Sequence, residues 1–387
     1  MSYFWLLLGF LAGVLITTFA LSGARRLEPG SKRGGPHKKA IDAALARLAA
    51  GHHTAAAASL RQATELQSGD DAIYLLLGEE LRRAGDASRA ERVAEILLAR
   101  RDLAGELRSA AWLLKGRLLE GAQREDEALA AYAKAVDSDT KELAPLIAQG
   151  RLFSRLRRWE EAIRVGEAVT RLDPERGRLI TARRRALAAR EYVAEGRAKD
   201  ALREARRAVE AEPQLAAAQM SLGDAHLQLG EPRKARESWH EAAKRAPWLA
   251  PAVLERLEYL ARASGERESV RRFAKDCASR EGEDTPPWRI FAWLVDEALR
   301  LDAIEEARGW CEKLERAAPL TATTARLRAR LAACEDGSHA GPRLLALLAR
   351  WENDPVWIDP WVCRVCGHQP EQLEWRCSKC QAWESLR

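Results

Sequence analysis

The chain has 387 residues, of which 47% are hydrophobic and 31% are charged, and its formal net charge is +6 with a pI near 9.0. Residues 1–40 hold six basic residues and one acidic residue, a net of +5, so the other 347 residues carry only +1. This distribution argues against a nucleic-acid-binding protein, because the body of the chain is close to neutral.

The N-terminal segment, residues 1–23, is predicted to be a membrane-spanning helix. Tyr3 to Leu21 form an uncharged run of 19 residues, and a helix of that length would measure about 28 Å, close to the hydrocarbon thickness of a bilayer. A cleaved signal peptide is the alternative, but no basic residue precedes the run and the run is long for such a peptide. Gly9 and Gly13 are spaced as in helices that pack closely, which would permit a homodimer, although such pairs are common in apolar helices.

A basic tether, residues 24–39, follows the apolar run. It contains six Lys or Arg residues against one acid, Glu28, and the stretch Pro-Gly-Ser-Lys-Arg-Gly-Gly-Pro is typical of an irregular linker. Basic residues next to a membrane span stay on the cytoplasmic side. We therefore expect a single-pass protein whose body, after residue 24, faces the cytoplasm.

Residues 40–345 are rich in Ala, Leu, Arg and Glu, and the sequence predicts an all-α solenoid of about seven or eight helical hairpins. A small residue recurs at intervals of 38, 34, 39 and 34 residues, and alanine follows it twelve positions later each time. We expect the two small residues to face each other and to let the paired helices approach closely. The five pairs are Gly78 with Ala90, Gly116 with Ala128, Gly150 with Ala162, Ala189 with Ala201, and Gly223 with Ala235.

Proline marks the end of three of these units. Pro174, Pro213 and Pro247 each lie 24 residues after the small residue of the first helix, where proline stops a helix and starts the next unit. This spacing resembles the tetratricopeptide repeat, whose concave face, built from the first helices, binds peptides or folded partners. A weaker first unit is predicted over residues 40–70, a divergent one near Gly265, and a late one from Ala298, Ala307 and Pro319.

The sequence shows no convincing active site, so we expect a protein that is not an enzyme. It contains no P-loop, no G-x-S-x-G and no HExxH motif. The histidines are scattered, with no carboxylate or cysteine partner at ligand spacing, and are expected to be solvated or to fill space. They are His37, His52, His53, His226, His240, His339 and His368.

The C-terminal segment, residues 346–387, carries the strongest chemical signal, a C-x2-C-x10-C-x2-C pattern. Its four cysteines are Cys363, Cys366, Cys377 and Cys380. Two such pairs supply a complete tetrahedral shell, so we expect a closed, structural metal site in a rubredoxin-type ribbon. Zn²⁺ is the expected ion, with iron as the alternative. Disulfides are the other interpretation, but the remaining cysteines are scattered and odd in number, and a cytoplasmic body would keep thiols reduced.

Tryptophan is concentrated near the same end of the chain. Four tryptophans within the helical region are expected to fill the core: Trp112, Trp159, Trp239 and Trp310. Five more lie in the last 37 residues: Trp351, Trp357, Trp361, Trp375 and Trp383. A small ribbon cannot bury five indoles, so we expect it to dock against the last repeats through some of them.

The order of anchor, tetratricopeptide solenoid and four-cysteine ribbon resembles the lipopolysaccharide assembly protein B family of Gram-negative bacteria. The specific part of the likeness is Cys363-Arg-Val-Cys366-Gly367, followed by Trp375-Arg-Cys377-Ser-Lys-Cys380 and Ala382-Trp383. The resemblance places the metal ligands on the four cysteines and implies a location in the bacterial inner membrane.

The resemblance also implies a function, an adaptor that regulates lipopolysaccharide biosynthesis. Such an adaptor would present the deacetylase that commits to lipid A synthesis to the membrane protease FtsH, and would respond to a membrane-embedded sensor of lipopolysaccharide. The competing hypothesis is a generic membrane-tethered scaffold for another envelope or quality-control complex. Nucleic acid is not expected as a partner.

Overall fold

The computed structural model describes residues 35–67, 69–280, 288–318, 321–335, 361–370, 375, 377–380 and 382–383. The predicted anchor and most of the predicted tether lie outside the described residues, as do Pro319, Trp351, Trp357 and His339. Among the helices of the described ranges, none is long and apolar enough to cross a membrane.

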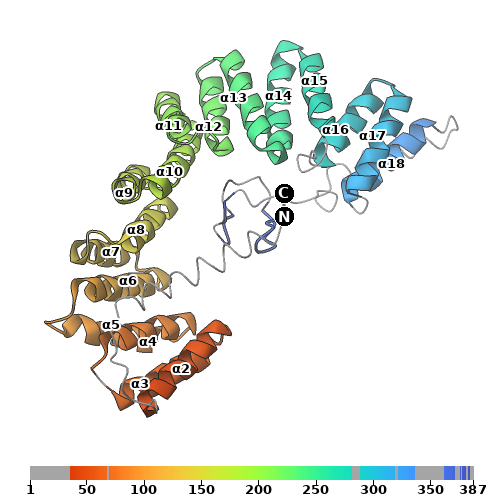
Figure 1. Cartoon of the computed structure of the whole chain (residues 1–387). Coiled ribbons are helices and arrows are strands. Elements are labelled where there is room, and N and C mark those ends of the chain that lie inside the picture. The colour runs from red at the N-terminus through yellow and green to blue at the C-terminus, as the bar shows by residue number, and fades with distance from the viewer. Residues whose placement is uncertain are drawn as a thin grey trace. The chain divides into compact units, whose positions relative to one another are not determined.

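The described chain is an all-α repeat solenoid followed by the ribbon, as the composition predicts (Figure 1). It divides into two compact units, Met1–Pro145 and Leu146–Arg387. The first unit contains α2 (Pro36–Ala49), α3 (His53–Leu66), α4 (Asp71–Arg83), α5 (Ala87–Ala99), α6 (Gly105–Gly121) and α7 (Glu125–Ser138). The helix α8 (Leu143–Arg155) begins at the boundary.

The second unit continues the same alternation of paired helices. It contains α9 (Trp159–Leu172), α10 (Pro174–Ala194), α11 (Ala198–Ala211), α12 (Ala216–Gln228), α13 (Pro232–Arg245), the 3-10 turn η1 (Pro247–Leu249), α14 (Ala250–Ser264), α15 (Arg267–Ala278), α16 (Trp288–Arg300), α17 (Ile304–Ala317) and α18 (Ala322–Glu335). In chain order, α2 to α17 therefore make eight consecutive helix pairs, and α18 follows them.

Each of these eight pairs is closed by a turn that contains one residue with a positive φ. Five turns use glycine, at Gly51, Gly85, Gly196, Gly230 and Gly265. The other three use Gln123, Arg157 and Asp302, with φ near +60°. A left-handed residue in the turn reverses the chain within a few residues, and a non-glycine residue there costs about 1 kcal/mol. The repeat is thus more regular in its backbone than in its sequence.

The recurring small residues lie in the contact between paired helices, but the expected facing of glycine and alanine is only partly correct. All five alanines are fully buried, from Ala90 in α5 to Ala235 in α13. The glycines of the first helices, however, make room for larger side chains. The Tyr132 ring at Gly116 and the Trp239 indole at Gly223 come from the second helix of the same pair, whereas Arg184 at Gly150 comes from the next pair. Gly78 accommodates both Val93 of its own pair and Leu114 of the next. A small residue on one helix therefore accommodates a larger side chain of a neighbouring helix.

Polar groups buried in the solenoid can join several helices, as the contacts around Trp239 illustrate. Its indole Nε1 donates to Asp224 Oδ1 at 3.0 Å, and Arg256 Nε donates to the same oxygen at 2.6 Å. Because Asp224, Trp239 and Arg256 belong to α12, α13 and α14, one carboxylate joins three successive helices. Of the other tryptophans expected in the core, Trp159 is buried, whereas Trp112 and Trp310 are half-buried.

Candidate metal centre and groove

The first cysteine knuckle is a tight turn held by its own backbone. The N–H of Gly367 donates to the Cys363 carbonyl at 2.8 Å, and the N–H of Cys363 donates to the His368 carbonyl at 2.8 Å. Gly367 has φ +70°, a conformation that glycine adopts without strain. The turn brings the Cys363 and Cys366 side chains to the same side.

The second knuckle repeats this arrangement and meets the first. Cys377 N–H donates to the Ala382 carbonyl at 2.9 Å, and His368 Nε2 lies 3.0 Å from Ser378 Oγ, which joins the two turns. The four sulfurs lie within 4.8 Å of one another. Cys363 Sγ is 3.6 Å from Cys380 Sγ, and Cys366 Sγ is 3.7 Å from Cys377 Sγ.

These distances fit a tetrahedral S₄ metal site. A Zn–S bond of about 2.3 Å in a regular tetrahedron separates the sulfurs by about 3.8 Å, close to the values found here. A backbone hydrogen bond from Ala382 lowers the pKa of Cys380, but desolvation and hydrogen bonds with the other three cysteines raise it further, to about 12. Without a cation Cys380 therefore holds its proton, and a bound cation would release it. The arrangement suggests a closed site that leaves no position for substrate.

The ribbon contacts the solenoid through its tryptophans, as the sequence predicts. Trp375 is buried in the large hydrophobic core of the second unit, and Trp383 packs against that core. The Trp361 ring lies under the Arg289 guanidinium of α16, at 4.3 Å from the ring centroid. Trp383 lies under Arg183 of α10 at 5.1 Å, so the ribbon also reaches a repeat well before the last one.

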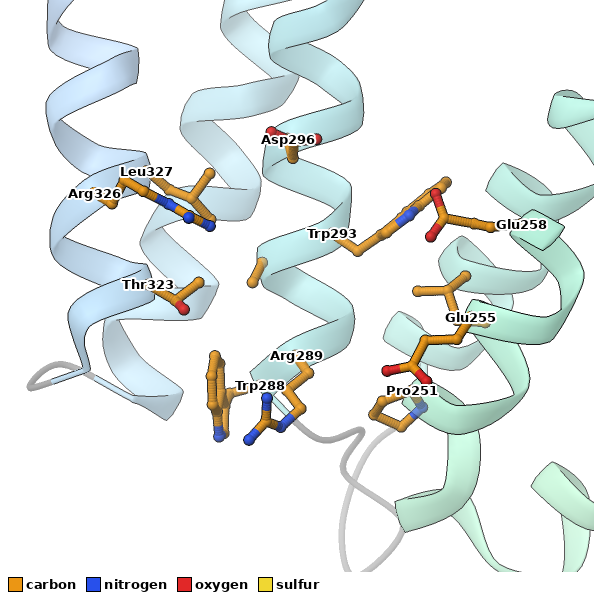
Figure 2. A pocket seen from close by; sticks show the side chains of 12 residues that line it. Pro251, Glu255, Glu258, Trp288, Arg289, Trp293, Asp296, Thr323, Arg326 and Leu327 are labelled. Carbon is orange, nitrogen blue, oxygen red and sulfur yellow. The ribbon is translucent and has the colours of Figure 1, made fainter. Parts of the chain in front are cut away.

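A groove of about 280 Å³ runs between α14 and α16, the first helices of successive pairs, and α18, which follows the last pair. Figure 2 shows Trp288, Arg289 and Trp293 on α16, Glu255 and Glu258 on α14, and Arg326 on α18. The Trp293 indole and the Glu258 carboxylate extend toward each other across the groove, while Arg326 extends from α18 toward α16 (Figure 2). The groove thus combines two indoles with charged groups of both signs.

The groove and the ribbon share one side chain. Arg289 lines the groove, and its guanidinium lies between the Trp288 ring, at 4.7 Å, and the Trp361 ring of the ribbon, at 4.3 Å. A guanidinium placed over aromatic faces is held by cation–π attraction. A ligand in this groove would therefore lie beside the ribbon.

Two histidines have carboxylate partners that the sequence spacing did not indicate. His53 Nδ1 lies 2.7 Å from Oε2 of the buried Glu80, and His226 Nδ1 lies 2.6 Å from Glu231 Oε2. Each joins adjacent segments of the solenoid, and among the described residues only the four ribbon cysteines gather as a metal-binding cluster. The pairs are therefore contacts within the repeat.

The other cysteines are free thiols. Burial raises the pKa of Cys277 to about 11 and also raises that of Cys311, so both are poor nucleophiles. Cys334 on α18 is exposed. The sequence-based separation of the four clustered cysteines from the three scattered ones agrees with the structure.

The sequence did not indicate the two tryptophans of the groove or the two arginines that contact the ribbon. Trp288 and Trp293 are five residues apart, a spacing that gives no simple helical face, and arginine is too frequent in this chain for Arg183 or Arg289 to stand out. A signal was available in the two tryptophans of α16, because α16 is the first helix of its pair and first helices build the binding face of such a repeat.

Comparisons with known proteins agree with both parts of the chain. Residues 361–387 match the family model of the LapB zinc ribbon, described as a rubredoxin metal binding domain, and residues 75–142 and 187–251 match a tetratricopeptide repeat model. A search of curated protein sequences finds no match. The chain is thus similar to a class of repeat proteins with a rubredoxin-like ribbon.

Several solved structures are similar to this chain, and some of them are described as tetratricopeptide repeat proteins. One from Parabacteroides merdae is 14% identical, with a TM-score of 0.40, over 82% of this chain and 100% of that chain. YrrB, described as a TPR protein with an unusual peptide-binding site, is 18% identical with a TM-score of 0.37, over 49% of this chain and 92% of that chain. MamA is 18% identical with a TM-score of 0.34, over 43% of this chain and 93% of that chain.

Proposed function

We propose that this protein is an adaptor of the bacterial inner membrane that regulates lipopolysaccharide biosynthesis. In this role it presents the deacetylase that commits to lipid A synthesis to the FtsH protease. The observation that carries the proposal is the match of residues 361–387 to the LapB-type ribbon, in a chain whose other matched segments are tetratricopeptide repeats.

The groove between α14, α16 and α18 is the proposed client site. The indoles of Trp288 and Trp293 offer apolar area, and Glu255 and Glu258 offer acceptors for a basic side chain or a backbone N–H. Arg326 Nε is buried and makes no hydrogen bond within the described part of the chain, so a client carbonyl or carboxylate would satisfy it. A short extended or helical segment of a client has the right size and chemistry.

The four ribbon cysteines are the proposed ligands of a structural Zn²⁺. The ion, when bound, would fix the two knuckles in place and supply no reaction of its own. Because Trp361 lies two residues before Cys363 and contacts Arg289, a metal-loaded ribbon would hold Arg289 in its place beside the groove. Loss of the metal would weaken the Trp361 contact of that side chain.

The apolar segment Tyr3–Leu21 is the proposed anchor. A single membrane span would hold the solenoid close to a membrane-bound protease and raise their effective concentration without any added contact. The basic residues after the span would face anionic lipids on the cytoplasmic side.

The first experiment is a measurement of the half-life of the lipid A deacetylase in cells depleted of this protein. Those cells are complemented with the natural chain, with Cys377→Ser, or with Cys334→Ser as a control that removes an exposed thiol outside the cluster. We expect slow turnover in depleted cells and with Cys377→Ser, and normal turnover with Cys334→Ser. Unchanged turnover in every strain would contradict the adaptor role and favour a scaffold with another client.

A further inference from the structure

A second hollow, of about 500 Å³, lies among α9, α10 and α11 and plays no part in the metal centre or the groove. Its lining is dominated by arginine, with Arg171 from the end of α9, Arg178 from the start of α10 and Arg207 from α11 on its rim. Arg185 completes the set at the floor. We infer that this hollow binds a phosphate group, either free or on the headgroup of a lipid.

Close packing of two helices brings the first two arginines together. Gly177 of α10 lies so near to α9 that a Cβ at this position would collide with the backbone of Thr170. Arg171 and Arg178 are the next residues along their helices, and both line the hollow. Two like charges are thus placed on facing elements beside the same hollow, so an anion bound there would be attracted by both.

The polar side chains at the floor of the hollow already have hydrogen-bond or ion-pair partners within the protein. Arg185 Nη2 lies 2.5 Å from Glu167 Oε1, and Arg185 Nη1 lies 2.5 Å from Glu204 Oε2. The Thr170 hydroxyl donates to the Gly166 carbonyl at 3.0 Å and lies 3.3 Å from the Thr181 hydroxyl. Recognition of a ligand therefore falls to the three arginines on the rim.

The rim arginines are exposed and largely unneutralised. Within the described residues, Arg171 and Arg178 contact no carboxylate, and Arg207 has only a long ion pair with Glu204, at 3.7 Å. The lining has four guanidiniums and two carboxylates, Glu167 and Glu210, and with Glu204, which pairs with Arg185 and Arg207, the formal charge is +1. The positive charge favours an anion, and guanidinium groups bind phosphate oxygens in a bidentate manner.

Helix dipoles explain only part of this arrangement. A basic residue in the last turn of a helix is favourable, which accounts for Arg171 in α9. Arg178 is the fifth residue of α10, near the positive end of that dipole, where a cation gains nothing. The volume exceeds what one phosphate needs, so the hollow leaves room for the group that carries it.

The test uses the full chain in uncharged detergent and isothermal titration calorimetry. One arm titrates inorganic pyrophosphate, and the other titrates dihexanoyl phosphatidic acid below its micelle concentration, with dihexanoyl phosphatidylcholine as the blank. The variant is Arg171→Gln with Arg178→Gln. Its matched control is Arg164→Gln with Arg206→Gln, two exposed arginines of α9 and α11 that do not line the hollow.

We expect saturable binding of at least one phosphate probe, and a loss of affinity of about tenfold or more in the Arg171 and Arg178 variant alone. Tighter binding of phosphatidic acid than of pyrophosphate would assign a lipid headgroup, and the reverse would assign a free phosphate. The inference is overturned if neither probe binds saturably, or if the control variant loses as much affinity. It stands independently of the proposed client and of its turnover.

Discussion

The contact between α6 and α7 requires a residue without a side chain at position 116, which is Gly116. A Cβ at this position would overlap the ring of Tyr132, with the ring Cζ only 3.1 Å away. Tyr132 is fully buried, and its hydroxyl donates to Glu120 at 2.6 Å, so the ring cannot withdraw without losing that bond. The glycine is therefore needed for the α6–α7 contact.

We expect Gly116→Ala to destabilise the first unit by about 1–2 kcal/mol. Overpacking costs about 1–3 kcal/mol, while the better helix propensity of alanine returns up to about 1 kcal/mol. The matched control is Gly121→Ala at the end of the same helix, where no atom lies within 4 Å of the added methyl. Urea unfolding followed by circular dichroism should show a lower midpoint only for Gly116→Ala, and equal midpoints would contradict this account.

The surroundings of Glu297 in α16 indicate that the stability of the second unit depends on pH. Its side chain is only 2% exposed, and it contacts Arg300 at 2.7 Å and Arg267 at 2.9 Å. Burial raises the pKa of this carboxyl, but the hydrogen bonds from Arg300 and Arg267 outweigh burial and leave the pKa below its ordinary value. A lowered carboxyl pKa stabilises the fold above the unfolded-state pKa, and this stabilisation is lost as the pH falls through the folded-state pKa.

We therefore expect Glu297→Gln to lower the stability of the second unit by about 2 kcal/mol at pH 7. The difference from the natural chain should hold down to about pH 5 and shrink as the pH falls below the ordinary carboxyl pKa and through the lowered pKa of the folded state. Thermal unfolding across this pH range measures the difference. Glu305→Gln, at a side chain that is 85% exposed, is the control and should change little at any pH.

At the scale of elements, the ribbon and α16 form one contact from two distant segments. Trp361 packs with Cys363 and Cys377 inside the ribbon and lies under Arg289 on its outer side. The same indole therefore contributes to the folding of the ribbon and to its docking. Separating the two effects requires a change on each side of the contact.

We expect Trp361→Ala and Arg289→Ala each to loosen the docked ribbon. A cation–π contact contributes about 1 kcal/mol, so its loss should raise the undocked population about fivefold. Limited proteolysis should then cut faster within residues 340–360. Arg289→Ala leaves the ribbon's own packing intact and should retain one metal ion per chain, so unchanged cleavage in that variant would argue against docking through this residue.

Periodic features of the chain were predictable, and contacts between distant segments were not. The alanines from Ala90 to Ala235 recur because every pair of helices needs the same close approach. The repeated pattern is therefore visible within a single sequence. The four cysteines were predictable because their spacing alone determines the knuckles. The contact of Arg289 with Trp361 joins residues 72 positions apart, and no local pattern records such a pairing.

At the scale of the whole molecule, the proposal assigns the parts of the chain to different tasks. The groove is proposed to select the client, and the ribbon to hold one wall of the groove. The apolar N-terminal run is proposed to set the location. Of these, location is the task that can be changed without altering any described contact, because the predicted anchor precedes α2, the first helix of the described residues.

Removal of residues 2–23 should therefore weaken the function and leave the solenoid and ribbon folded. Without a membrane span, the chain must meet a membrane protease by diffusion, and the loss of effective concentration can amount to about a hundredfold. We expect the truncated chain to appear in the soluble fraction with its metal retained, and the half-life of the deacetylase to approach that of depleted cells. Replacement of residues 2–23 by an unrelated single-pass helix of the same orientation should restore rapid turnover, because proximity is all that the span contributes in this account. Full activity of the soluble truncation would refute the role of the anchor, and failure of the substituted helix would show that the natural span makes a specific contact of its own.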